Sequence, residues 1–274
     1  MKRFTQVLFF IAFAALVFAQ SSIKVPAVDS SGKGILTSVE ASVKPGSGAV
    51  YLDVEPFISV ETQESAKLAV KIAGEQAGVD TRFYDVFFKV VANTELIDGP
   101  PGGAAFTLLA YAEFAGKQIR SDFSSTGTIE PDGSIGPIGG VLEKAYAARD
   151  NKLKVFAVPM DQGIQNGVDL TKMQGKWNMQ VVEVSNIVDL IPVAFSQEGT
   201  FVNVTRRERA PLVLPVFNSS SSVEPMSEIA RTQLTALRDL NKALSSKNTE
   251  EALVVSSAVD EQLNLSEYLL DNGF

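Results

Sequence analysis

A chain of 274 residues with 45% hydrophobic residues can build one sizeable core and an appendage. The lack of cysteine excludes disulfides, thiol catalysis and thiolate metal sites, and the lack of histidine removes the usual general base and the usual zinc ligand. A net charge of −8 disfavours binding to nucleic acid or to anionic lipid. Proton transfer in this chain therefore has to use lysine, aspartate, glutamate or tyrosine.

Residues 1–19 have the pattern of a secretory signal peptide. Lys2 and Arg3 precede 12 apolar residues from Val7 to Phe18, and Ala19 offers a small residue for cleavage. This stretch is short compared with the ~20 residues that span a bilayer. We expect cleavage after Ala19 and a secreted or cell-surface protein, with an uncleaved membrane anchor as the alternative. Without the leader, 22 basic residues face 32 acidic ones.

The next part of the chain favours strands and then a helix. Runs rich in β-branched residues at 23–28, 35–43 and 49–58 are separated by glycine-containing turns, which predicts a three-stranded opening. Residues 61–73 place alanine and valine on one helical face, with acidic residues in the first turn. Residues 84–92 then predict a buried strand.

The central stretch, residues 98–144, contains two glycine-rich turns. Asp98-Gly-Pro-Pro-Gly-Gly103 precedes an apolar helix expected at 104–114. Ser125-Thr-Gly-Thr-Ile129 is a short β-like run, followed by a Pro-Asp-Gly turn. The loop Gly136-Pro-Ile-Gly-Gly140 then leads into a helix that carries Lys144 in its first turns.

The remaining elements complete the core and add a C-terminal appendage. Strands are expected at 154–159 and 181–184, followed by a helix capped by Ser185. Residues 197–225 read as a linker, and 226–274 as a helical hairpin that packs against the body or binds a partner. On its first helix one side carries Ala230, Leu234, Leu237, Leu240 and Leu244.

The central motifs resemble the proteolytic domain of the Lon family of serine-lysine proteases. That family carries Asp-Gly-Pro-Ser-Ala-Gly, a Thr-Gly strand and Pro-Ile-Gly-Gly-x-x-Glu-Lys. The opening strands and the Gln-Glu-Ser-Ala helix are also similar to exported archaeal Lon-type proteins without an ATPase module. The resemblance implies an α+β fold over residues 20–196, with a small mixed sheet backed by helices.

The resemblance also implies roles for individual residues. Lys144 matches the dyad lysine, Thr126 the threonine that orients it, and Asp98 the residue that closes the loop. Gly102 and Gly103 match the oxyanion loop, and Pro101 stands where the family has serine. No metal ligands and no cofactor are implied.

Pro101 removes the attacking atom of the dyad. The 43 residues from position 101 to Lys144 equal the family's spacing without a gap, so no shift of the alignment supplies a serine. Proline has neither a hydroxyl nor an N–H, although it suits the first position of a helix. The sequence therefore indicates a tight turn into a helix.

Three functions follow as alternatives. The first is an exported, inactive homologue that binds unfolded or extended peptide segments. The second is an ATP-independent endopeptidase of the Lon family that uses Thr107 or a lysine-activated water as an unorthodox nucleophile. The third, DNA binding, is disfavoured by the acidic charge, so we expect no nucleic-acid partner; a homo-oligomer stays open. The chain contains no Gly-x-x-x-x-Gly-Lys-[Ser/Thr] signature of an ATPase module.

Two geometric expectations follow from the family resemblance. Lys144 should lie within about 8 Å of Pro101, close enough for a serine there to reach it directly or through one water. Lys144 should also be largely buried and hydrogen-bonded to Thr126, with its pKa lowered by desolvation. Trp177 is expected to be a packing residue.

Overall fold

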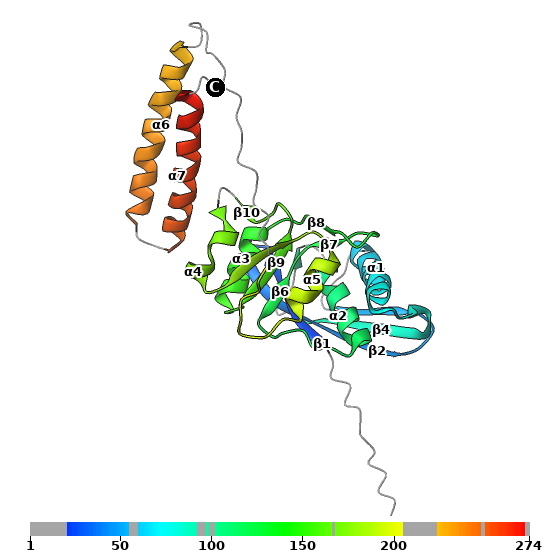
Figure 1. Cartoon of the computed structure of the whole chain (residues 1–274). Coiled ribbons are helices and arrows are strands. Elements are labelled where there is room, and N and C mark those ends of the chain that lie inside the picture. The colour runs from blue at the N-terminus through cyan, green and yellow to red at the C-terminus, as the bar shows by residue number, and fades with distance from the viewer. Residues whose placement is uncertain are drawn as a thin grey trace, which may run out of the picture.

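The computed structural model describes residues 21–54, 60–91, 97–98, 102–165, 168–204, 224–247 and 250–271. The leader, Pro101 and most of the expected linker lie outside these residues. Within them the chain forms small sheets backed by helices, so the expected α+β fold is confirmed (Figure 1). Among the described residues, no helix combines the length and the apolar character needed to cross a membrane.

The first sheet has five strands in the order β3-β4-β2-β1-β5. The expected opening strands are present, but the third does not extend the hairpin: β3 pairs in parallel with β4, which itself pairs antiparallel with β2. The strands are β1 (Ser21–Asp29), β2 (Gly34–Pro45), β3 (Val50–Val54), β4 (Tyr84–Val91) and β5 (Ile97–Asp98).

Two helices, an amphipathic one and an apolar one, form the main core with this sheet. Helix α1 (Val60–Ala77) packs against α2 (Gly103–Ala115), and α2 packs against β1 and β2. Small residues dominate α2, so its backbone can approach the sheet closely. Phe106 packs against Phe88 of β4 with 4.8 Å between ring centres and an angle of 60° between the rings. A short helix, η1 (Thr81–Phe83), connects α1 to β4.

The second sheet is parallel, with the order β12-β9-β6. A second hydrophobic cluster lies beside it, where buried Trp177 contacts Tyr146 edge to face, so Trp177 is a packing residue as expected. The elements of this region are β6 (Phe123–Ser125), α3 (Val141–Asp150), β9 (Val155–Pro159), β10 (Ile164–Gln165), β11 (Val168–Asp169), η2 (Leu170–Lys172), α4 (Gln174–Trp177) and β12 (Gln180–Val184).

Helix α5 (Ile187–Ala194) begins one residue later than the sequence predicts. The N-cap is Asn186, whose side-chain oxygen accepts the Asp189 N–H at 2.9 Å, so the prediction of Ser185 as the cap was wrong. The Ser185 carbonyl instead accepts the N–H of Ile135. Ile135 belongs to β8 (Ile135–Gly136), which pairs with β7 (Thr128–Ile129).

The C-terminal part contains two long antiparallel helices, α6 (Glu224–Ser245) and α7 (Glu250–Asp271) (Figure 1). They are joined by Asn241, whose side-chain amide donates to the Ser256 carbonyl and to Asp260. Leu237 and Leu240, which the sequence placed with the packed residues of α6, are exposed. The side of α6 that packs against α7 is rotated by part of a turn from the predicted side, and it includes Asn241.

Candidate functional site

The motif residues surround a cavity of about 840 Å³. Six segments contribute to its wall: β1, the first half of α1, the start of α2, β7 with the residue after it, the loop that leads into α3, and α3 itself. The lining residues are Val28, Glu64, Ser65, Leu68, Gly102, Gly103, Thr128, Ile129, Glu130, Pro137, Ile138, Gly139, Gly140 and Lys144. The two glycine-rich turns therefore meet at one place, although 36 residues separate Gly103 from Gly139.

Described residues lie on both sides of position 101, where the family resemblance places the serine. Asp98 on β5 pairs through its backbone with Val28 of β1, and Val28 lines the cavity. Gly102, directly after Pro101, also lines it. Pro101 itself lies outside the described residues, so its expected distance to Lys144 stays a prediction.

Gly102 and Gly103 are required by close packing at the start of α2. A Cβ at Gly102 would lie 2.7 Å from the Gly127 carbonyl oxygen, and a Cβ at Gly103 would lie 2.6 Å from Ile129 Cγ2. The Ala104 N–H donates to the same Gly127 carbonyl at 3.2 Å. The N-terminus of α2 is thereby fixed against the segment between β6 and β7.

Lys144 reaches the cavity from the first turns of α3. Its Nζ donates to the Gly139 carbonyl at 3.0 Å, and the residue is half-buried rather than largely buried. Gly139 lies five residues before Lys144, so the side chain folds back along the first turn of α3 to reach that carbonyl. The ammonium therefore has a partner other than the Thr126 hydroxyl that the sequence suggested.

Thr126 lies behind the cavity wall. It is 2% exposed, and its backbone N–H donates to the Ala157 carbonyl of β9 at 3.0 Å. Gly127 follows with φ +135°, a backbone conformation that favours glycine and that turns the chain from β6 into β7. Thr126 thus connects the parallel sheet to the strand that borders the cavity.

Strand β7 presents backbone groups toward α2. The Ile135 N–H points away from β7 and donates to Ser185, so Ile129 and Ile135 form a non-hydrogen-bonded pair. The N–H and C=O of Ile129 consequently point away from β8, and a Cβ at Gly103 would lie 2.8 Å from the Ile129 nitrogen. This side of β7 is therefore covered by the start of α2, and Ile129 is buried.

The turn between β7 and β8 is fixed by Asp132. Its Oδ1 accepts the Ser134 hydroxyl at 2.7 Å and the Ser134 N–H at 2.9 Å. These hydrogen bonds hold the pKa of the Asp132 carboxyl below its usual value, and the bond from the hydroxyl has the larger effect. The turn therefore keeps its anionic cap at neutral pH and holds β7 in place.

Comparison with known proteins identifies the family. Residues 26–197 match the model of the Lon protease (S16) C-terminal proteolytic domain. This chain belongs to the Lon proteolytic-domain family.

Similarity to individual Lon proteases is moderate. The chain is 30% identical over 166 residues to Lon protease of Desulfovibrio desulfuricans, covering 59% of this chain and 19% of that protein. It is 29% identical over 199 residues to Lon protease 1 of Herpetosiphon aurantiacus, covering 69% and 23%. It is 26% identical over 177 residues to Lon protease of Escherichia coli K12, covering 62% and 22%. The matched part thus spans about a fifth of each of these relatives.

Thr107 is poorly placed as a nucleophile in this Lon domain. It is 0% exposed, and its hydroxyl donates to the Gly103 carbonyl one turn earlier at 2.8 Å. A hydroxyl bound inside the helix cannot attack a peptide in the cavity. The structure therefore overturns Thr107 as the unorthodox nucleophile.

Ser65 is a cavity residue that the sequence reasoning did not select. It is half-buried on α1, and its Oγ lies 2.7 Å from the Cβ position of Gly103. A signal was present, because Ser65 directly precedes Ala66 and lies four residues before Ala69, both on the buried face of α1. A serine at the border of an apolar helix face often lies beside a cavity wall rather than in solvent.

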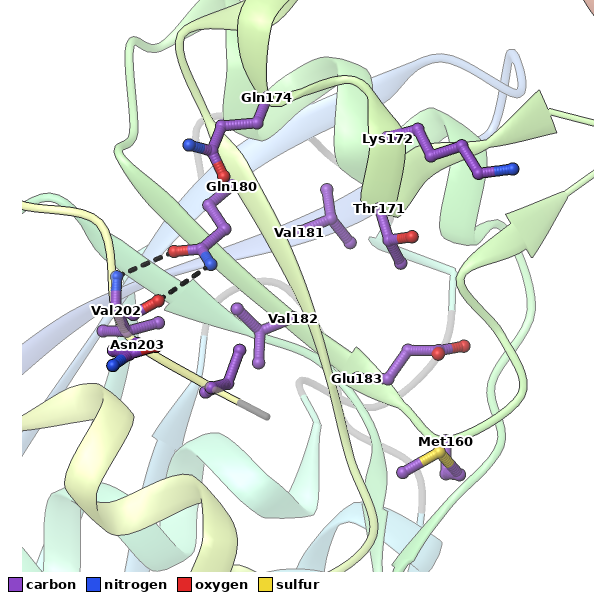
Figure 2. Close-up of a pocket in the computed structure, with 11 residues that line it drawn as sticks. Met160, Thr171, Lys172, Gln174, Gln180, Val181, Val182, Glu183, Val202 and Asn203 are labelled. Carbon is purple, nitrogen blue, oxygen red and sulfur yellow. Dashed lines mark hydrogen bonds between the residues drawn. The ribbon is translucent and has the colours of Figure 1, made fainter. Parts of the chain in front are cut away.

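A second cavity of about 530 Å³ lies beside β12, away from the Lon motif (Figure 2). Figure 2 shows the Gln180 side chain bound to Val202, donating to its carbonyl at 3.0 Å and accepting its N–H at 2.8 Å. Two charged lining residues also have protein partners: Glu183 accepts the Gly163 N–H, and Lys172 pairs with Asp169. These contacts hold neighbouring segments together, so the motif-lined cavity remains the better candidate.

Proposed function

We propose that this Lon-family chain is an exported, catalytically inactive homologue that binds unfolded or extended peptide segments. The observation that carries the proposal is proline at position 101 in a motif whose surrounding parts line one cavity. A Lon dyad needs an oxygen at this position, because the covalent step that divides the barrier starts there. A water activated by Lys144 would lack both that step and a fixed direction of attack.

Peptide binding rests on the wall of the cavity. Leu68, Ile138 and Val28 supply apolar surface to it. An extended peptide could contact this surface with its apolar side chains.

The binding half of the proposal can be tested with glycine variants. Gly139 lines the cavity and has no atom within 4 Å of its Cβ position, so Gly139→Trp should fill the cavity without a backbone clash. Gly175 on α4 has equally open space outside the cavity, which makes Gly175→Trp the matched control. In fluorescence anisotropy with a labelled unfolded casein fragment, we expect Gly139→Trp alone to lose binding. Equal binding by both variants would place the ligand elsewhere.

The catalytic half can be tested by restoring the nucleophile. Pro101→Ser should produce cleavage of unfolded casein that disappears again with Lys144→Met, whereas Pro101→Ala should not. Gly102 is best left unchanged, because a Cβ there crowds Gly127. Cleavage by the natural chain that depends on Lys144 and survives controls for contaminants would contradict the proposal.

A second candidate function is an ATP-independent endopeptidase with another nucleophile. Ser65 favours it, since a hydroxyl lies in the same cavity as Lys144 and beside the N-terminus of α2. A helix N-terminus can stabilise an oxyanion. Labelling of Ser65 by a fluorophosphonate, lost in both Ser65→Ala and Lys144→Met, would support this candidate over the inactive one.

Export forms part of the proposal and is supported by the apolar stretch behind Lys2 and Arg3. The protein should be recovered outside the cell with an N-terminus at Gln20. N-terminal sequencing of the released protein measures this directly, and a retained Met1 in a membrane fraction would favour the anchor.

A further inference from the structure

Helix α6 carries an exposed apolar stripe outside the Lon domain. Its four large members are Met226, Ile229, Leu237 and Leu240, which are 68%, 58%, 49% and 67% exposed. Leu244 continues the stripe and is half-buried. The match to the Lon family ends at residue 197, so the family motif does not account for this surface.

The stripe is not the surface that holds the hairpin together. The contact between α6 and α7 uses Asn241, which donates to Ser256 and Asp260, and Arg238, which donates to Asn264 and Glu267. The body is contacted by α7, at β11. Figure 1 shows the hairpin as a pair of long helices beside the body. The stripe therefore lies on a side of α6 that neither contact uses.

The four exposed members of the stripe are spaced symmetrically about Gln233, and Leu244 lies outside this symmetric set. Met226 and Ile229 precede Gln233 by seven and four residues, and Leu237 and Leu240 follow it by four and seven. These intervals keep all five residues on one face of an α-helix. This spacing is the same in both chain directions. Two copies of the helix that lie antiparallel can therefore place apolar residues opposite apolar residues along the whole symmetric set. A different partner protein would not require this symmetry.

We propose that α6 pairs with α6 of a second copy of this chain, antiparallel and across a two-fold axis at Gln233. Met226 then faces the partner's Leu240, and Ile229 faces the partner's Leu237. Gln233 meets the partner's Gln233, and because an amide side chain is both donor and acceptor, the two can bind each other. Such a contact uses the same patch on both copies and closes at two.

The size of the stripe fits a reversible dimer. From Met226 to Leu240 the helix is about 21 Å long, and with side chains it is about 10–12 Å wide. Two such faces with their flanking side chains bury on the order of 1,000 Å², near the lower limit for a specific interface. We therefore expect a dissociation constant in the micromolar range, which sets the concentrations for the experiment.

Sedimentation equilibrium of the full chain, from about 1 to 200 μM, tests the pairing. The natural chain should approach twice its monomer mass as the concentration rises. Leu240→Glu should weaken association by about tenfold or more, because a carboxylate would be buried without a partner. Thr235→Glu adds the same charge to the opposite side of α6 and should have little effect. Loss of association in both variants, or in neither, overturns the proposal.

Cross-linking tests the register, and the chain has no natural cysteine to interfere. Gln233→Cys should give a disulfide-linked dimer under mild oxidation, since the two thiols face each other at the axis. Met226→Cys and Leu240→Cys should link when mixed and remain unlinked when oxidised separately. Separate linking would show a parallel pair and contradict the antiparallel proposal, as would a lack of linking by Gln233→Cys.

Discussion

Gly103→Ala tests whether the close approach of α1, α2 and β7 shapes the cavity. The new Cβ would lie 2.6 Å from Ile129 Cγ2, 2.7 Å from Ser65 Oγ and 2.8 Å from the Ile129 backbone nitrogen. Two of these atoms belong to a paired strand, so the change cannot be absorbed by one flexible side chain. Overpacking of this kind costs about 1–3 kcal/mol. The helical preference of alanine returns up to about 1 kcal/mol.

The net expectation is a loss of about 1–2 kcal/mol in the free energy of unfolding. Gly139→Ala is the matched control, because this glycine lines the same cavity and has open space at its Cβ position. Its stability should change by less than about 1 kcal/mol, and in the stabilising direction. Urea unfolding at 25 °C, followed by the fluorescence of buried Trp177 and by circular dichroism, measures both variants. Equal stability of the two variants would refute the packing argument.

Three further predictions concern the rest of the domain. Arg120→Met should lower the free energy of unfolding by about 3–5 kcal/mol, because the buried guanidinium binds Asp122, Ser196 and the Thr200 carbonyl. An unchanged midpoint of urea unfolding would show that these hydrogen bonds do not hold the 196–200 segment. Burial raises the pKa of the Asp122 carboxyl, but the hydrogen bonds from the Arg120 guanidinium and the Gly199 N–H outweigh burial, so this pKa is lowered in the folded protein. The ionised carboxyl therefore stabilises the fold above its unfolded pKa of about 3.9, and this stabilisation is lost as the pH falls from there through the folded pKa. The stability difference between the natural chain and Asp122→Asn should therefore shrink as pH falls from 6 to 3, and a constant difference would contradict the direction of the shift. Thr107→Val should lose about 0.5–1.5 kcal/mol by removing the hydrogen bond to Gly103, and it should leave peptide binding unchanged in the anisotropy assay.

Local sequence signals predicted the elements around the cavity. Glycines before an apolar run marked the start of α2, and Gly-Gly before Val141 marked the start of α3. The family motif then predicted that these two starts belong to one site, and both line the same cavity. Periodicity alone would have given the helices without their meeting point.

Long-range pairing was not predictable from these signals. Strand β3 follows β2 after a short turn, yet it pairs with β4 in parallel, because α1 crosses over between them. The direction of the Lys144 side chain likewise depends on the loop beside it, where the Gly139 carbonyl accepts a hydrogen bond from its ammonium. In the hairpin, two adjacent stripes of α6 contain apolar residues, and a contact between two helices buries one of them. The sequence alone does not show which of the two stripes the contact buries.

The pairing of Gln180 with Val202 has a consequence for behaviour at high concentration. Strand β12 is the last strand of its sheet, and an uncovered edge invites strands of neighbouring molecules to join it. Gln180 satisfies the N–H and C=O of Val202 with its own amide, so the 201–204 segment stays beside β12 without forming a further strand. That segment obstructs intermolecular sheet growth in the way that bulges and edge charges do elsewhere. The contact between Gln180 and Val202 thus leaves less of the β12 edge open to a strand of a neighbouring molecule.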